Sequence, residues 1–193
     1  MTVWLWALGR MLGLGDMAGM RPSLTLAVIG IASKFDLGPG VSAPFFWMDH
    51  WFTILIFVVL AIFEASFDKV PKWDRLQGRL TMPYRLVAGG IAGASVIHLG
   101  WPGFVAGATV GAVMAWVSLL TKGRTRPRSV SSDAALNLLS LYEDLAALLG
   151  TVVTLAFAPF GYVIAGFEGI VYFGARYRHK AKYRKLKDGG SGR

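Results

Sequence analysis

The segment WMDHWFTILIFVVLAIFEASFDKVPKWD, residues 47–74, carries the clearest structural signal in the chain. It contains an apolar run from Trp51 to Phe63 without any charged residue, and a short charged segment that includes Pro71 follows directly. A helix that leaves a hydrocarbon layer and enters a charged loop is the simplest physical explanation of this order. The sequence therefore predicts a membrane helix that ends near Glu64.

Glu64 is the first charged residue after the apolar run, and Phe67 still lies beyond it. On a helix, Glu64 and Asp68 share one face, one turn apart. A carboxylate at that depth must find a partner, reach the interface or take up a proton. Two interpretations stay open at this point. The pattern E-x-x-x-D-K-x-P-x-x-D is either part of a functional site or a capping and interfacial segment in which Pro71 stops the helix.

The composition is that of a membrane protein. The chain has 193 residues, of which 54% are hydrophobic and only 16% charged, and its mean hydropathy is +0.52. This is too apolar for an ordinary soluble domain of the same length. We expect a single transmembrane domain over residues 1–188, and a remnant of cloning in the Gly-rich end, residues 189–193. Because cysteine is absent and the three histidines are scattered, we expect no disulfide, metal or other cofactor.

The net charge of +9 is concentrated at the edges of the apolar segments, in residues 69–85, 122–128 and 176–187. This distribution predicts retention on the cytoplasmic side of a membrane, not nucleic-acid binding. We therefore expect a multi-pass protein of the inner (cytoplasmic) membrane with its basic loops and C-terminal tail in the cytoplasm. The expected partners are the lipid bilayer, anionic lipids at the basic loops, and either a second copy of the chain or a membrane partner protein.

The N-terminal part predicts a discontinuous element. Val3 to Leu14 forms a short apolar segment, a Gly-rich run follows, and Pro22 suits the start of a second short helix that extends to Ser33. Each piece is shorter than the roughly 20 residues that cross a bilayer core. The pair is either a broken or re-entrant element, or one interfacial helix with one irregular span. At the break, Arg21 would offer several donors to a carboxylate or a phosphate.

The middle of the chain predicts a helical hairpin from Pro83 to Leu120, with a turn at Gly100–Gly103. Glycines at small-x-x-x-small spacing predict closely packed helix backbones; they are Gly89, Gly93, Gly103, Gly107 and Gly111. Arg21-Pro22 and Pro83-Tyr84-Arg85 start coarsely similar halves of the chain. An inverted repeat is one interpretation of this echo, although no strict sequence period supports it.

The C-terminal part contains an amphipathic helix and a last apolar run. In residues 131–149 the acid pair Glu143 and Asp144 is better explained as a solvated helix face than as a buried site. The apolar run, residues 145–173, is interrupted by Pro159. A bent hairpin at residues 158–161 would return the basic tail to the cytoplasm, whereas a single crossing would leave it outside.

Several motifs together resemble a known family. They are A-G-M-R-P-S-L-T-L from Ala18, the E-x-x-x-D-K-x-P-x-x-D pattern from Glu64, R-L-V-A-G-G from Arg85, and N-L-L-S-L-Y-E-D from Asn137. In this order they resemble an uncharacterised bacterial multi-pass membrane family, domain of unknown function number four-one-two-six. The family usually shows a His shortly before the lysine of the second basic loop, where this chain has Trp116, Ser118 and Thr121. The resemblance implies an α-helical integral membrane protein and no established activity.

The fold class expected from these patterns is all-α: a polytopic integral membrane helical bundle with short broken or re-entrant helices. The first functional hypothesis is a transporter or lipid flippase that handles an anionic or proton-coupled substrate through a charged intramembrane site. Its predicted residues are Arg21, Glu64, Asp68, Lys69, Asp74, Arg85, Glu143 and Asp144. The alternative is a non-catalytic membrane subunit or scaffold that binds a partner protein or anionic lipid. No catalytic motif predicts an enzyme.

Overall fold

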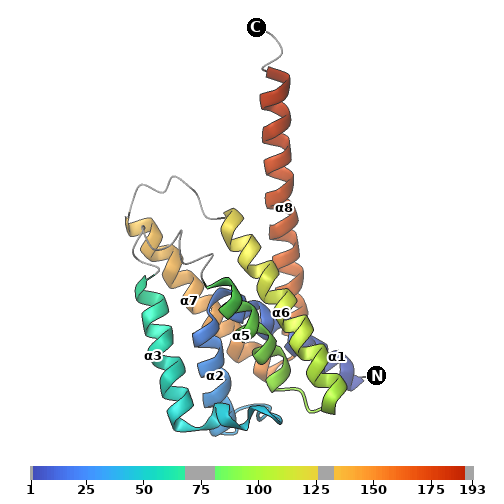
Figure 1. Ribbon diagram of the computed structural model, residues 1–193. Coiled ribbons are helices and arrows are strands. Elements are labelled where there is room, and N and C mark those ends of the chain that lie inside the picture. Colours follow the sequence, from blue (N-terminus) through green and yellow to red (C-terminus); the bar gives the residue numbers. More distant parts are fainter. Residues whose placement is uncertain (1, 68–80, 126–132, 190–193) are drawn as a thin grey trace.

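The computed structural model describes residues 2–67, 81–125 and 133–189, and within these ranges every regular element is a helix (Figure 1). The predicted all-α helical bundle is confirmed. In chain order the elements are α1 (Thr2–Met20), α2 (Pro22–Lys34), the 3₁₀ helix η1 (Phe45–Asp49), α3 (Trp51–Phe67), α5 (Met82–Ser95), α6 (Gly100–Thr125), α7 (Asp133–Ala156) and α8 (Phe160–Gly189).

Helix α1 is the central element, because it packs against α2, α5, α6, α7 and α8. Its second half is buried without interruption from Gly13 to Gly19. The prediction of a short segment that ends at Leu14 is therefore wrong, since the helix continues to Met20. Glycine weakens an isolated helix, but here the glycine faces are covered by neighbouring helices, and this packing outweighs the low helix propensity.

Three helix backbones meet closely at Gly111 of α6. A Cβ atom on Gly15 of α1 would lie 2.6 Å from the Gly111 Cα, and a Cβ atom on Gly89 of α5 would lie 2.7 Å from the Gly111 carbonyl oxygen. Real Cβ atoms do not approach other atoms so closely, so only glycine permits these contacts. The predicted close packing of the α5–α6 hairpin is confirmed. Its turn comes earlier than predicted, at residues 96–99, because α6 already begins at Gly100 and accommodates Pro102 in its first turn.

Helices α7 and α8 form the bent hairpin that the sequence favoured. The turn contains Pro159, and the Phe160 N–H donates to the Phe157 carbonyl oxygen at 3.0 Å. Both arms are longer than predicted. The amphipathic segment and the first apolar arm form one continuous helix, α7, and the second arm continues into the basic tail as α8. Beyond the turn, both helices pack more extensively against α1 than against each other.

The apolar side chains of this protein face outward to an unusual degree. Large exposed hydrophobic residues cover α3 in particular, including Phe52, Leu55, Ile56, Val59, Leu60, Ile62 and Phe63. Charged side chains, in contrast, are found among the buried residues. Two helical segments of the described chain, Gly100–Lys122 and Leu138–Ala156, are long and apolar enough to span a membrane. An apolar exterior with charges inside is the distribution that a lipid environment favours.

Candidate functional site

The candidate site is built around the junction of α1 and α2. Arg21 is the only residue between the two helices, with φ −139° and ψ 81°. Its extended conformation follows from Pro22, since a proline ring disfavours helical geometry in the residue before it. The Arg21 N–H still donates to the Met17 carbonyl oxygen at 2.8 Å. Pro22 has no N–H, however, so the last carbonyl groups of α1 need other donors.

Arg85 of α5 supplies two of those donors. Its Nη1 donates to the carbonyl oxygens of Gly19 and Met20, at 2.6 Å each. Its Nη2 pairs with the Glu64 Oε1 at 3.1 Å, and its Nε donates to the Thr81 hydroxyl at 3.2 Å. Positive charge at the C-terminal end of a helix is electrostatically favourable. Arg85 therefore stabilises the end of α1 and pairs with the buried carboxylate of α3 at the same time.

Arg21, unlike Arg85, makes its side-chain contacts with α7. Its Nε lies 2.6 Å from the Asp144 Oδ1, its Nη2 lies 3.8 Å from the Glu143 Oε2, and Nη2 also donates to the Ser140 hydroxyl at 2.9 Å. Lys122 of α6 lies 2.6 Å from the same Glu143 oxygen. The guanidinium of Arg21 is almost fully buried, and such a charge is tolerable only when it is paired and hydrogen-bonded.

We call these six charged residues the junction network: Arg21, Lys122, Glu143 and Asp144 on one side, and Glu64 and Arg85 on the other. It contains three cations and three carboxylates, so its charges balance when all are ionised. The two parts meet at the end of α1, where the Met20 carbonyl binds Arg85 and the next residue is Arg21. The structure therefore brings together groups that lie as far apart in sequence as Arg21 and Asp144.

The predicted site residues fall into two groups. The structure gathers Arg21, Glu64, Arg85, Glu143 and Asp144 at the junction. The remaining three, Asp68, Lys69 and Asp74, lie outside the described residues. The expected solvated face at residues 143–144 is wrong for Glu143, which is 7% exposed. The reason is its pairing with Arg21 and Lys122, and these partners come from distant segments that helix periodicity cannot identify.

Three buried or nearly buried charged residues were not part of the predicted site: Lys122 of the junction network, and Asp16 and Glu168 outside it. The sequence predicts a basic loop at Lys122, whereas the residue belongs to α6 and only 13% of its side chain is exposed. Asp16 and Glu168 are also buried, at 1% and 5% exposure. The signal that could have identified the two acids is their position inside apolar helical segments, where an ionisable side chain is costly. Asp16 lies in the Gly-rich run between Leu14 and Pro22, where the sequence predicts a break and not a buried acid.

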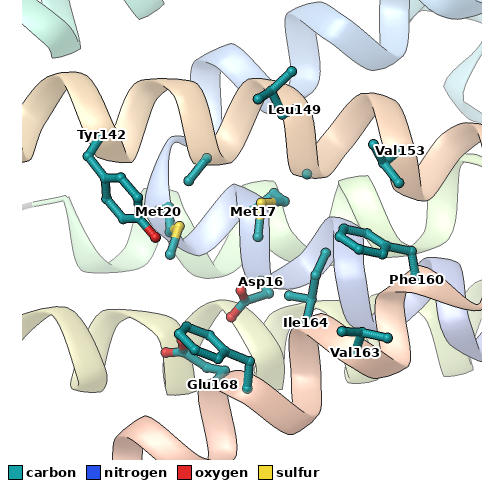
Figure 2. A pocket seen from close by; sticks show the side chains of 13 residues that line it. Asp16, Met17, Met20, Tyr142, Leu149, Val153, Phe160, Val163, Ile164 and Glu168 are labelled. Carbon is teal, nitrogen blue, oxygen red and sulfur yellow. The ribbon is translucent and has the colours of Figure 1, made fainter.

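Asp16 and Glu168 line a cavity of about 340 Å³ between α1, α7 and α8 (Figure 2). Most of the other lining side chains are apolar; they include Met17, Met20, Leu149, Val153, Phe160, Val163, Ile164 and Phe167. Met20 connects this cavity to the junction network, because its side chain lines the cavity and its carbonyl group binds Arg85. In the part of the chain that the structure describes, no group of three or more His, Cys, Asp or Glu side chains is arranged to hold a metal ion.

These features define an α-helical protein with an apolar exterior and paired charges in its interior. The chain belongs to the family described as domain of unknown function DUF4126, whose match covers residues 8–176. This match confirms the family resemblance that the sequence motifs indicated. Comparison with curated proteins and with solved structures gave no significant match.

Proposed function

We propose that this protein is a small multi-pass membrane transporter or lipid flippase that moves an anionic or proton-coupled substrate past the junction network. The observation that carries the proposal is the buried network at a helix break. Breaks between helices inside a membrane expose backbone groups and charges only where they contribute to a cavity or a binding site. Buried charges of both signs are costly in lipid, and for this reason they usually have a functional role.

The charge balance of the network suggests how protons and an anion could be coupled. The six described residues of the network, three cations and three carboxylates, are neutral together when all are ionised. Uptake of one proton by a carboxylate leaves one positive charge in excess, and this excess favours an anionic group beside an arginine. Asp144 is the natural point of access, because 30% of its side chain is exposed whereas Arg21 is buried. An anionic substrate would exchange with Asp144 at the Arg21 guanidinium.

The arrangement of helix ends supports a defined orientation in the inner (cytoplasmic) membrane. In Figure 1 the end of α3, the start of α5, the end of α6, the start of α7 and the end of α8 lie at the same end of the bundle. The three basic segments of the chain adjoin these ends. Excess Lys and Arg mark the cytoplasmic side, so this end is proposed to face the cytoplasm.

Flux into proteoliposomes tests the proposal. Vesicles would carry a fluorescent anionic phospholipid in one assay and an internal pH-sensitive dye in the other. We expect wild-type protein to accelerate at least one of the two fluxes over empty vesicles, and Glu64→Gln to abolish it while the protein stays folded. The matched control is Asp49→Asn, which removes a carboxylate from the last position of η1, before α3. Unchanged flux in Glu64→Gln would remove Glu64 from the mechanism.

The second candidate is a non-catalytic subunit, and the exposed face of α3 favours it. Phe52 and Ile62 are 75% and 62% exposed, and α3 packs mainly against α2 and η1. Such a face fits either lipid or a helix of another membrane protein. Purification in mild detergent distinguishes the candidates: stoichiometric recovery of another protein favours the subunit, and a lone homo-oligomer disfavours it.

A further inference from the structure

The cavity between α1, α7 and α8 differs from the junction network in one decisive respect. The network is neutral, whereas the described residues that line the cavity include two acids and no Lys, Arg or His. Figure 2 shows the Asp16 side chain directed from α1 toward α8, where Glu168 lies. The two carboxyl groups are close enough to act on each other electrostatically. No lining residue would therefore compensate the charge of these two acids when they are ionised.

Each acid also has an unused hydrogen-bond acceptor. Ser118 and Thr121 of α6 contribute hydroxyl groups beside Asp16 and Glu168 respectively. The Asp16 Oδ1 and the Glu168 Oε1 are buried, and neither has a hydrogen-bond partner within the described residues. A buried carboxyl oxygen without a donor is costly, and more so where no counter-charge is near, so a ligand that supplies both gains free energy when it binds.

The shape and lining of the cavity restrict the chemical class of that ligand. Its volume of about 340 Å³ is within the range of small-molecule sites, and such sites combine apolar walls with a few polar groups. An inorganic divalent cation takes about six oxygen ligands and keeps water where protein oxygens are lacking, and the apolar side chains around these two carboxyl groups offer few hydrogen bonds to hold such waters. An anion would be repelled. What fits is a positive charge with N–H donors on an apolar body.

We propose that this cavity binds a lipophilic ammonium compound, whose cationic head pairs with Asp16 and Glu168 and whose apolar body contacts the side chains of α7 and α8. The apolar body would lie against Leu149 and Val153 on one wall and Phe160 and Ile164 on the other. This site is separate from the junction network, and its existence does not depend on the proposed transport function. Binding can be measured without any gradient, so the two proposals fail independently.

The test is calorimetric titration of the full chain in lipid nanodiscs with 4-phenylbutylamine, which is cationic at pH 7. The neutral analogue 4-phenylbutanol has nearly the same shape and tests the role of the charge. We expect the amine to bind at least about tenfold more tightly than the alcohol, a difference of about 1.4 kcal/mol. Equal affinity for the two compounds would show a merely apolar cavity and overturn the proposal.

Variants then assign the charge effect to the two acids. Asp16→Asn and Glu168→Gln should each weaken amine binding by about tenfold or more and leave alcohol binding unchanged. Asp49→Asn removes an equal charge away from the cavity and should leave both affinities unchanged. Each variant removes a buried charge without changing side-chain size, so each is expected to fold, and thermal unfolding checks this. If one acid variant fails to fold, the other decides: unchanged amine affinity in that variant contradicts the proposal.

Discussion

At the scale of single residues, the protein depends on how buried charges are satisfied. Arg85 makes four contacts with four different residues, of which two are backbone carbonyl groups at the end of α1. Lysine has the charge but not the planar fork of donors, so it cannot reproduce this set. Arg85 therefore connects three helices, α1, α3 and α5, through one side chain.

Replacing Arg85 tests this role directly. We expect Arg85→Met to lower the free energy of unfolding by about 3–5 kcal/mol, because it leaves Glu64 buried without its guanidinium. Glu64→Gln should cost much less, since the amide oxygen still accepts from Arg85. The measurement is unfolding in mixed micelles, with Lys34→Met at an exposed position as the control. Equal destabilisation by Arg85→Met and Lys34→Met would contradict the pairing.

Combining the two positions separates the pair from its members. In the double variant Glu64→Met/Arg85→Met, both charges are absent, so we expect less destabilisation than the sum of the two single variants. The difference measures the interaction energy of Glu64 with Arg85. Strictly additive effects would show that the two side chains do not interact in the folded protein.

At the scale of elements, some glycines permit close packing between helix backbones and others do not. Gly111 receives α1 and α5 at the same point, and a Cβ atom there would collide with the Gly89 carbonyl group. Gly166 and Gly169 of α8, in contrast, have no atom near the position of an added Cβ. Packing therefore requires glycine at Gly111 of α6, whereas it leaves room for a larger side chain at Gly166 and Gly169 of α8.

Paired substitutions exploit this difference. We expect Gly111→Val to destabilise the bundle by about 1–3 kcal/mol or to prevent folding, since the added side chain forces the helices apart. Gly166→Ala and Gly169→Ala should be neutral or slightly stabilising, because alanine favours a helix. Thermal unfolding in detergent compares the three variants. Loss of stability in the α8 variants but not in Gly111→Val would contradict the described packing.

These elements also show how far the sequence could predict the structure. The start of α2 at Pro22 and the turn at Pro159 were predictable, because proline restricts its own backbone and that of the residue before it. The continuation of α1 through Gly13 and Gly15 was not, since it depends on helices that cover those glycines from distant parts of the chain. Arg21, Glu143 and Asp144 were predictable as site residues, whereas the ion pairs between them, and the part that Lys122 of α6 has in the network, depend on packing between distant segments.

At the scale of the whole molecule, the proposed topology places opposite ends of the bundle in different compartments. The loop after α2 and the last part of α8 lie at opposite ends in Figure 1. Leu37 in that loop and Tyr177 in α8 are both exposed, at 70% and 77%. The inverted repeat stays a prediction.

Cysteine labelling tests this topology without background, since the chain has no native cysteine. We expect a membrane-impermeant maleimide to label Leu37→Cys in cells whose outer membrane is permeable to it. Tyr177→Cys should react only after the inner membrane is opened, because the adjoining basic tail favours the cytoplasm. Labelling of both positions from the same side would contradict the proposed crossings.

Whether the junction network is a transport site is decided by the flux of protons or anionic lipid per folded molecule in Asp144→Asn proteoliposomes. Asparagine keeps an acceptor for Arg21 and removes the charge with which a substrate would compete. If the junction network is the transport site, flux should change by about tenfold, which corresponds to about 1.4 kcal/mol of activation free energy. The melting temperature should change little. A flux equal to that of the wild type would show that the network only holds the helices together.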